Sequence, residues 1–544
     1  MALLDRFLPR TDFEDYADFK ENFRLTVPEN FDFVRDVVDV LAAESPEKTA
    51  LLYCGDEGED RRYTFGDIAE LSKKAAAYLK GIGIRTGDRV LVMLRRRAEY
   101  WICATALHRL GATVIPASIQ FTQKDIVYRI NLSGATGIIY LDDPFVCQQL
   151  EGIEAQCATL RHKIFVGDTP GAEGHDFCRE YLACAPYTET DTRPITAEFI
   201  AYFTSGTTSM PKIAIHNKTY PLGHIATARY MQHARDGGLH FTMADSGWAK
   251  FGWGCLYGQW ICGSAILGYD PLRFDAANLM RVMERCGPTS LCVPPTIYRF
   301  LLRDGLRQRH VASVEWFSTA GEPLDPEVNR ELRRITGHPV HEGFGQSEGT
   351  PITCTYEWLD VRPGSMGKPS PLYDVAIIGG DGAPCGPGDV GEVVIRTDPE
   401  KPYIVGLTEG YLTPGGFQKC YDTLYHTGDM AYMDNDGYYW FVGRNDDMIK
   451  CSGYRIGPFE VESVLNTHEG VRESAIIGRP DPIRGQVVCA VVALQEGYAP
   501  SPELTKELQD HVRKNTAPYK YPRIIEYRDA LPKTTSGKII RRHL

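Results

Sequence analysis

The sequence predicts an α/β protein with a large, multi-lobed N-terminal domain of βαβ sheets and a small α+β domain at its C-terminal end. From about Arg61, short β-branched runs alternate with amphipathic stretches of helix length, which is typical of βαβ units with parallel strands. Residues 373–442 are richer in strands and turns, which predicts an antiparallel or distorted β-barrel subdomain. After residue 447 the alternation of helix and strand patterns restarts, so a further domain is expected there.

The expected strands of the first part share β-branched, apolar runs, and they lie at residues 89–94, 113–116, 136–141, 199–203, 264–269 and 289–293. Those of the turn-rich part lie at residues 375–378, 392–395 and 438–442. In the last part we expect helices at 459–466 and 503–513 and strands at 475–477, 487–494 and 523–527. The domains are therefore expected to be residues 1–445 and 446–544.

Composition and charge narrow the class of protein. The chain is 43% hydrophobic and 24% charged, as soluble globular proteins are, and its net charge of −12 argues against a broad nucleic-acid-binding surface. No stretch of roughly 18 apolar residues occurs, so no integral membrane contact is expected, and the first residues lack the apolar core of a signal peptide. The 15 cysteines form no Cys-x-x-Cys pair, which predicts free thiols in a reducing cytoplasm.

The strongest chemical signal lies in residues 204–212. This segment follows a buried-strand pattern and places five hydroxyl residues and one glycine in six positions, which suits neither a core nor a helix. Its members are Thr204, Ser205, Gly206, Thr207, Thr208 and Ser209. Hydroxyl and backbone N–H groups of such a loop can converge on phosphate oxygens. It is no Walker A loop, because no second glycine precedes Lys212 and Pro211 blocks the following helix. A flexible surface turn is the alternative.

Four more motifs follow in order, at residues 343–348 (Gly-Phe-Gly-Gln-Ser-Glu), 425–429 (Tyr-His-Thr-Gly-Asp), 443–447 (Gly-Arg-Asn-Asp-Asp) and 532–538 (Pro-Lys-Thr-Thr-Ser-Gly-Lys). Together with the hydroxyl loop they resemble the adenylate-forming (AMP-binding) superfamily, from about Arg61 to the C-terminus. Residues 246–248, 452–458 and 517–523 most resemble the medium-chain acyl-CoA synthetases. One departure is Ser209, which stands where the family's loop usually has its second glycine.

The resemblance implies an acid–thiol ligase that converts a carboxylic acid, ATP and coenzyme A to acyl-CoA, AMP and diphosphate through an acyl-adenylate. ATP, Mg²⁺ and coenzyme A are the implied cofactors and substrates. Residues 1–445 would bind ATP and the acid, and residues 446–544 would be a mobile domain with the catalytic lysine. The implied acid is medium-chain, branched, or cyclic or aromatic.

The resemblance also assigns the nucleotide site. Lys538 would be the catalytic cation that stabilises charge on the α-phosphate, although a solvated lysine in a basic tail is the alternative. Glu348 would be the metal ligand, because Mg²⁺ is held by one or two carboxylates and substrate oxygens. The remaining ATP- and AMP-binding residues are the hydroxyl loop with Lys212, then Gly321, Glu322, Pro323, Glu342, Gly343, Phe344, Gly345, Gln346, Ser347, Asp429, Arg444 and Arg455.

Coenzyme A is assigned to the C-terminal domain. Asp446 would be the hinge about which this domain turns between the two half-reactions. Ser452, Gly453 and Tyr454 would line the pantetheine tunnel, and the CoA phosphates would meet Arg484, Arg513, Tyr521 and Arg523. Solvated surface charge is the alternative interpretation of these arginines.

The acyl pocket is expected near Trp248, Trp253 and Gly345. Acetyl-CoA synthetases have a tryptophan at the position of Gly345, so a glycine there implies an acid larger than acetate. Ordinary core packing is the alternative for both tryptophans, and Lys250, between them, has no derived role.

Several alternatives stay open. The same enzyme could run in reverse to make ATP from acyl-CoA, or an adenylating enzyme could use a non-CoA acceptor, as amino-acid adenylation domains and luciferases do. A nicotinamide-dependent oxidoreductase is disfavoured because Gly81, Gly83 and Gly87 do not form the dinucleotide fingerprint. The expected partners are the small-molecule substrates, without nucleic acid. A homodimer and a lysine acetyltransferase or deacetylase acting on Lys538 are further expectations.

Overall fold

The structure is a computed structural model that describes residues 3–55, 58, 60–167, 174–204, 211–271, 273–451, 454–482, 484–533 and 539–544, with backbone alone at 454, 455, 518 and 542. The chain divides into two compact units. The first comprises Met1–Pro363, Gly367–Asp374 and Thr397–Thr423, and the second comprises Gly364–Met366, Val375–Arg396 and Leu424–Leu544. The expected domain boundary after residue 445 lies inside the second unit, between two of its sheets, and stays a prediction.

One sheet of the first unit has the strand order β20-β19-β9-β8-β4-β3-β5-β6-β7. Its strands are β3 (Arg89–Met93), β4 (Thr113–Pro116), β5 (Gly137–Leu141), β6 (His162–Val166), β7 (His175–Asp176), β8 (Glu198–Thr204), β9 (Lys212–Asn217), β19 (Gly410–Thr413) and β20 (Gly416–Lys419). Neighbouring strands from β8 to β7 in this order pair in parallel. Strand β9 pairs antiparallel with β8 on one side and with β19 on the other. Every residue of β4 and β5 is buried, which explains their continuous apolar runs.

A second sheet of this unit has the order β16-β15-β14-β13-β12-β10-β11-β1-β2. Its strands are β1 (Thr49–Cys54), β2 (Arg61–Thr64), β10 (Leu239–Thr242), β11 (Ala265–Tyr269), β12 (Ser290–Cys292), β13 (Trp316–Ala320), β14 (Val340–Phe344), β15 (Thr353–Cys354) and β16 (Lys368–Pro369). The strands from β14 through β1 pair in parallel. Their carboxyl ends therefore meet at one edge, where open α/β sheets bind ligands.

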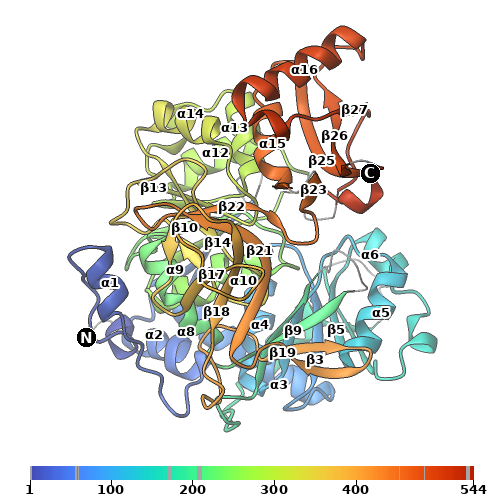
Figure 1. Cartoon of the computed structure of the whole chain (residues 1–544). Helices are drawn as coiled ribbons and strands as arrows, with labels where there is room; N and C mark the ends of the chain where they lie inside the picture. Colours follow the sequence, from blue (N-terminus) through green and yellow to red (C-terminus); the bar gives the residue numbers. More distant parts are fainter. Residues whose placement is uncertain are drawn as a thin grey trace. The chain divides into compact units, whose positions relative to one another are not determined.

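Helices of the first unit connect these strands. They are α1 (Tyr16–Asn22), α2 (Asp39–Glu44), α3 (Phe65–Ile82), α4 (Ala98–Leu110), α5 (Gln123–Ser133), α6 (Pro144–Gln149), α7 (Phe177–Glu180), α8 (Tyr220–Gly223), α9 (Ile225–Tyr230), α10 (Ala249–Cys255), α11 (Tyr257–Ile261), α12 (Ala276–Cys286), α13 (Pro295–Arg303) and α14 (Pro326–Thr336). Helix α3 begins at a capping box between Thr64 and Asp67 and ends at Gly83, whose φ is 118°. Helices α12, α13 and α14 lie side by side near β13 (Figure 1). Within the described ranges, none of the helices has the length and apolar character that crossing a bilayer requires.

The second unit contains two sheets. Strands β17 (Asp374–Ile378), β18 (Gly391–Arg396), β21 (Leu424–Met433) and β22 (Tyr439–Arg444) form the first in that order. Strand β21 pairs antiparallel with β18 and β22, as expected, and among the described residues β17 and β22 are the edges of an open sheet rather than partners that close a barrel. The second sheet comprises β23 (Ile449–Cys451), β24 (Tyr454–Ile456), β25 (Val471–Asp481), β26 (Gly485–Leu494) and β27 (Ile524–Tyr527).

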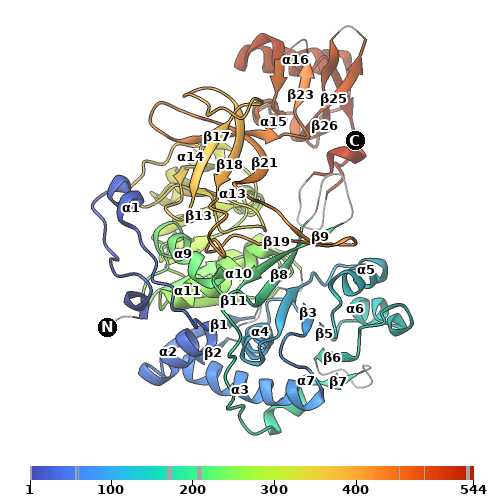
Figure 2. The same cartoon turned by 60° about the horizontal axis from the view of Figure 1, so that its bottom comes forward.

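Helices α15 (Pro458–Leu465) and α16 (Pro502–Asn515) pack against each other, and α15 packs on β25, as both views show (Figure 2). Their apolar faces share one core with the inward residues of β25 and β26. Strand β25 extends beyond the expected residues 475–477, because its polar end, with Arg479 and Asp481, still pairs with β26. The predicted mixed α/β fold with a smaller α+β C-terminal part is confirmed.

Candidate active site

Two predicted nucleotide segments meet at the carboxyl edge of the second sheet. Ala320 at the end of β13 is paired with Gly343 on β14, so the chain leaves both strands side by side. Gly321 then adopts a φ of 102°, a left-handed conformation that favours glycine. The segments 321–323 and 344–348 therefore start from neighbouring positions.

The two acidic residues of these segments have structural partners. Glu322 accepts hydrogen bonds from the backbone N–H of Thr296 (3.1 Å) and from its hydroxyl (2.8 Å). Glu342, buried, accepts one from the backbone N–H of Leu324 at 3.1 Å. Both carboxylates thus fix the loop between β13 and α14 against its neighbours, which presents the segment in one defined conformation.

A cation, an aromatic ring and a carboxylate come together next to these segments. Lys212, the first residue of β9, has its Nζ 3.4 Å from the ring centroid of Tyr411 on β19. The Tyr411 hydroxyl donates a 3.0 Å hydrogen bond to Oε1 of Glu348. Among the described residues, no salt bridge joins Lys212 directly to Glu348, because the tyrosine lies against both. We call these three residues the Tyr411 corner.

The backbone of this corner is fixed from two sides. The N–H of Thr408 donates to the carbonyl of Glu348 at 2.7 Å. On the other side, Nε2 of His216 on β9 donates to the carbonyl of Ser347 at 2.8 Å. Burial lowers the pKa of His216 to about 4, so this imidazole is neutral at physiological pH. The Ser347–Glu348 turn is thereby tied to strands of the other sheet.

The hydroxyl loop is described only at its ends. Thr204 closes β8 opposite Lys212 of β9, and its buried Oγ1 has no hydrogen-bond partner among the described residues. Ser205, Gly206, Thr207, Thr208 and Ser209 lie outside the described residues. Lys212, which is paired with Thr204, belongs to the Tyr411 corner.

The expected acyl pocket contains one clear apolar contact group. Trp253 on α10 packs with Cys292 and Ala320, the last residues of β12 and β13. Lys250, one turn earlier on α10, donates from Nζ to the carbonyl of Ala320 at 2.8 Å. The partly buried Trp248 precedes α10, and its buried Nε1 has no partner in the described part of the chain.

Gly345 has a different environment from the open space that the sequence interpretation assumed. A Cβ at this position would lie 2.9 Å from Cα and 3.3 Å from N of Pro351. These are backbone atoms, so a larger residue requires the chain at 350–351 to move. The glycine is therefore explained by close backbone approach, and its assignment to the acyl pocket stays a prediction.

The second unit brings three predicted residues together. Asp429 on β21 is paired with Arg444 on β22, and Nη1 of Arg444 lies 3.4 Å from Oδ1 of Asp429. Nε of Arg444 lies at the same distance from Oδ1 of Asp446, the predicted hinge. Gly428, with a φ of 71°, lets the Arg444 guanidinium pass close to the backbone, since a Cβ there would meet Nη2 at 3.0 Å.

Three of the four residues assigned to the CoA phosphates form one cluster. The guanidinium of Arg513 on α16 lies 4.1 Å from the ring centroid of Tyr521, and that of Arg523 lies 5.0 Å from it. Arg523 also donates to the Tyr521 hydroxyl at 3.0 Å. We call these residues the Tyr521 cluster. Arg484, the fourth of these residues, lies in the turn between β25 and β26.

The remaining predicted residues are described in part or not at all. Lys538, Ser452 and Gly453 lie outside the described residues, and Tyr454 and Arg455 are described by their backbone in β24 alone. The ends of the Lys538 segment are defined, because Lys533 and Ile539 form an antiparallel bridge. The roles of these residues stay predictions.

Sequence reasoning missed Tyr411 and His216. Neither belongs to one of the five motifs, and Tyr411 is 63 positions from Glu348 in the chain. His216 lies on β9 and Tyr411 on β19. The two strands pair with each other, which the sequence alone did not predict.

Comparisons with known proteins agree with this arrangement. The AMP-binding enzyme family model matches residues 38–412, and the model of the AMP-binding enzyme C-terminal domain matches residues 460–538. A Homo sapiens relative, "Acyl-coenzyme A synthetase ACSM3, mitochondrial", is 37% identical over 98% of this chain and 92% of its own length.

Solved structures extend the likeness to the fold. The anthranilate CoA ligase AuaEII in complex with anthranoyl-AMP has a TM-score of 0.85 and 27% identity, over 95% of this chain and 96% of that one. The acyl-CoA synthetase of Brucella canis has a TM-score of 0.70 and 30% identity, over 93% of each chain. These findings confirm the resemblance inferred from the motifs. The chain therefore belongs to the AMP-binding enzyme family, as an acid–CoA ligase that forms acyl-CoA with release of AMP.

Proposed function

We propose that the Tyr411 corner holds the diphosphate end of ATP while the acid is adenylated. This proposal rests on the observation that the ring of Tyr411 lies under Lys212 while its hydroxyl donates to Glu348. The cation and the carboxylate are therefore close together without forming the direct ion pair that would neutralise both. A lysine ammonium is a point charge suited to phosphate oxygens. The ends of the hydroxyl loop, at Thr204 and Lys212, lie at the same place.

Glu348 fits a Mg²⁺ ion in this corner. Mg²⁺ is held by one or two carboxylates together with phosphate oxygens and waters, and one oxygen of Glu348 is fixed by the Tyr411 hydroxyl. When bound, the ion would neutralise charge on the phosphates. Tyr411 orients the carboxylate, Thr408 holds the carbonyl of Glu348, and His216 holds that of the preceding Ser347.

Asp429 and Arg444 of the second unit are proposed to bind the ribose. Two carboxylate oxygens suit a pair of vicinal hydroxyls, and Arg444 holds one of them at 3.4 Å, which fixes the orientation of the Asp429 side chain. Lys538 is proposed to stabilise charge on the α-phosphate. The support for Lys538 is the motif at residues 532–538.

The Tyr521 cluster is proposed to bind the phosphates of coenzyme A. Two guanidinium groups on one ring make a local cation pair in a chain of net charge −12. Arginine suits phosphate because its planar group can donate two parallel hydrogen bonds. Arg484, in the turn between β25 and β26, is proposed to meet the CoA phosphates as well, on the strength of the sequence resemblance.

We propose that the acid is medium-chain, branched, or cyclic or aromatic. Trp253 with Cys292 and Ala320 offers an apolar surface, and the similar ligase AuaEII is described with anthranoyl-AMP, an aromatic adenylate.

The cysteines are all free, which supports a reducing compartment. We propose the cytoplasm, although the curated relatives are named mitochondrial. Homodimerisation and acetylation of Lys538 are also proposals.

An acid panel tests the proposed substrate class. Acetate, butyrate, 2-methylbutyrate, octanoate, benzoate and cyclohexanecarboxylate are assayed for AMP release that requires both ATP and CoA. Each buried CH₂ contributes about 0.8 kcal/mol, so we expect kcat/KM at least tenfold above acetate for the preferred acid. Acetate as the best substrate would overturn the proposed class. The same assay run from acyl-CoA, AMP and diphosphate measures the reverse direction.

A further inference from the structure

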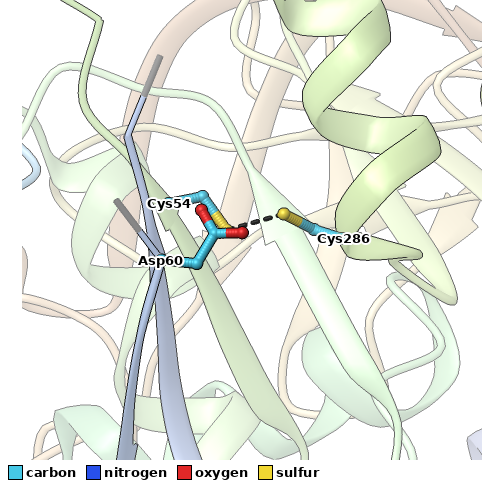
Figure 3. Close-up of side chains that lie close together, drawn as sticks. All are labelled: Cys54, Asp60 and Cys286. Carbon is cyan, nitrogen blue, oxygen red and sulfur yellow. Dashed lines mark hydrogen bonds between the residues drawn. The ribbon is translucent and has the colours of Figure 1, made fainter. Parts of the chain in front are cut away.

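Two cysteines far apart in the sequence touch within the first unit. Cys54 is the last residue of β1 and is fully buried, and the partly buried Cys286 is the last residue of α12. Their sulfur atoms are 2.6 Å apart across 232 positions of the chain. Figure 3 shows the two side chains pointing toward each other, with Asp60 beside them. None of the residues assigned to ATP, acid or CoA takes part in this contact.

A basic residue borders the pair. Arg285, adjacent to Cys286, donates to both oxygens of Asp60 at 2.9 and 3.0 Å and to the carbonyl of Gly55 at 3.0 Å. The hydrogen bond from the Cys54 thiol, assisted by Arg285, lowers the pKa of Cys286, whereas the same contact raises that of Cys54. Cys286 is the more exposed of the two thiols and follows the Arg285 cation directly in the chain. Because a peroxide must reach the thiolate that attacks it, we assign Cys286 as the nucleophile.

A divalent metal is a weaker explanation of the same group. The ligand atoms of Cys54, Asp60 and Cys286 lie within 4.8 Å of one another. Two thiolates on a tetrahedral zinc, each at ~2.3 Å, are about 3.7 Å apart, more than 1 Å farther than these sulfurs. The carboxylate of Asp60 is moreover already held by the Arg285 cation. Closing the sulfurs to the ~2.05 Å of a disulfide requires a shift of only about 0.5 Å.

We propose that Cys54 and Cys286 are a reversible dithiol–disulfide site, oxidised by a peroxide such as hydrogen peroxide. The Cys286 thiolate attacks a peroxide oxygen, the O–O bond breaks, and a sulfenic acid and, after protonation, water result. The Cys54 sulfur then attacks the Cys286 sulfur. The S–S bond forms, the S–O bond breaks, and hydroxide leaves as a second water with the Cys54 proton. The two thiols lose two electrons and the peroxide gains them.

The crosslink would join the end of β1 to the end of α12. Both belong to one apolar core with Leu267, Met283 and Leu291, and Cys286 packs against it. Because the sulfurs already touch in the folded chain, the bond forms without rearranging that core. It would close a loop of about the 232 positions between the cysteines, and such a constraint on the unfolded chain stabilises the folded one.

The test treats the purified full-length chain with hydrogen peroxide, alkylates the remaining thiols and identifies crosslinked peptides by mass spectrometry. We expect loss of two thiols, one crosslink between Cys54 and Cys286, its reversal by dithiothreitol, and a rise of the unfolding midpoint on the order of 3 °C. Cys286→Ser should abolish the crosslink. In Cys54→Ala the sulfenic acid of Cys286 should persist and be trapped by dimedone.

Cys147→Ser is the matched control. Cys147 is also partly buried and lies 3.7 Å from a carboxylate oxygen, that of Asp142, but no contact within the described ranges joins it to another thiol. This variant should form the crosslink as the wild type does. Oxidation of Cys286 to a sulfinic acid without crosslinking overturns the proposal. So does stoichiometric zinc in the purified chain that is lost in Cys286→Ser.

Discussion

Two tyrosines organise the charged groups of this enzyme in opposite ways. Tyr411, in the first unit, lies against a cation and a carboxylate, Lys212 and Glu348, that come from separate strands and loops. Tyr521, in the second unit, gathers two cations, Arg513 and Arg523, from within ten positions of the chain. The first arrangement keeps unlike charges apart, and the second brings like charges together.

The difference indicates two kinds of anion binding. A corner that offers a lysine and a carboxylate suits phosphates accompanied by Mg²⁺. Two exposed arginines, of which Arg513 also donates to Asp510 at 2.8 Å, suit phosphates that arrive alone, and their attraction falls with ionic strength. The half-buried corner should therefore matter for the adenylate step, and the exposed cluster for the affinity for CoA.

The largest expected effect is at Glu348. Glu348→Gln keeps the shape of the side chain but removes the charge, and the loss of one preorganised electrostatic contact costs about 10²- to 10³-fold in rate. We expect diphosphate exchange into ATP, with acid and without CoA, to fall by that factor. The matched control is Glu409→Gln, a neighbouring carboxylate that accepts from Asn217 at 2.7 Å. If both variants lose activity equally, Glu348 has no special role.

The next effect is at Tyr411 itself. Tyr411→Phe keeps the ring beneath Lys212 but removes the donor to Glu348, and the loss of such an outer partner of a metal ligand typically costs 10- to 100-fold in metal affinity or activity. We expect the Mg²⁺ concentration for half-maximal diphosphate exchange to rise by about tenfold or more. An unchanged Mg²⁺ dependence would contradict the role of the hydroxyl.

A smaller effect is expected in the Tyr521 cluster. A hydrogen bond to a charged group contributes about 1.5 kcal/mol or more, so Arg513→Ala and Arg523→Ala should each raise KM for CoA about tenfold. The effect should shrink as salt is added, because the arginines are exposed. Arg472→Ala, an exposed arginine of the same domain bound to the carbonyl of Asp529, is the control. Equal KM values for CoA in all three variants would indicate that the arginines of the cluster are solvated surface charges without a role in CoA binding.

The smallest effect concerns stability rather than rate. Burial lowers the pKa of His216 from 6.5 to about 4, so between these values the unfolded chain binds the proton and the folded chain does not. Stability from this group is therefore complete above pH 6.5 and is lost as the pH falls toward 4. We expect unfolding by urea at pH 5 to show a loss on the order of 1 kcal/mol relative to pH 7 that is absent in His216→Gln. An identical pH dependence of the free energy of unfolding in the wild type and in His216→Gln would contradict this contribution of His216.

Much of the fold could be predicted because the parallel strands are buried on both faces. Their apolar runs were recognisable without contacts, and the strand expected at residues 113–116 is β4 (Thr113–Pro116). Two members of the Tyr521 cluster, Tyr521 and Arg523, lie in the family motif at residues 517–523, and Arg513 precedes that motif by four positions.

The Tyr411 corner was only half predictable. Lys212 and Glu348 belong to motifs, but Tyr411 joins them through the pairing of β19 with β9, which no local pattern encodes. Gly345 shows a second limit. The sequence identifies a missing side chain but not its direction, and here a Cβ would meet the backbone of Pro351.

The most direct test measures both half-reactions in two variants, Glu348→Gln and the double variant Arg513→Ala/Arg523→Ala. One assay follows diphosphate exchange into ATP, and the other supplies synthetic acyl-AMP with subsaturating CoA and follows thioester formation. We predict that Glu348→Gln loses exchange by about 10²-fold or more while its thioester formation stays near wild type, and that the double variant shows the reverse pattern. Equal losses of both half-reactions in either variant would contradict the division of work between the two tyrosine sites.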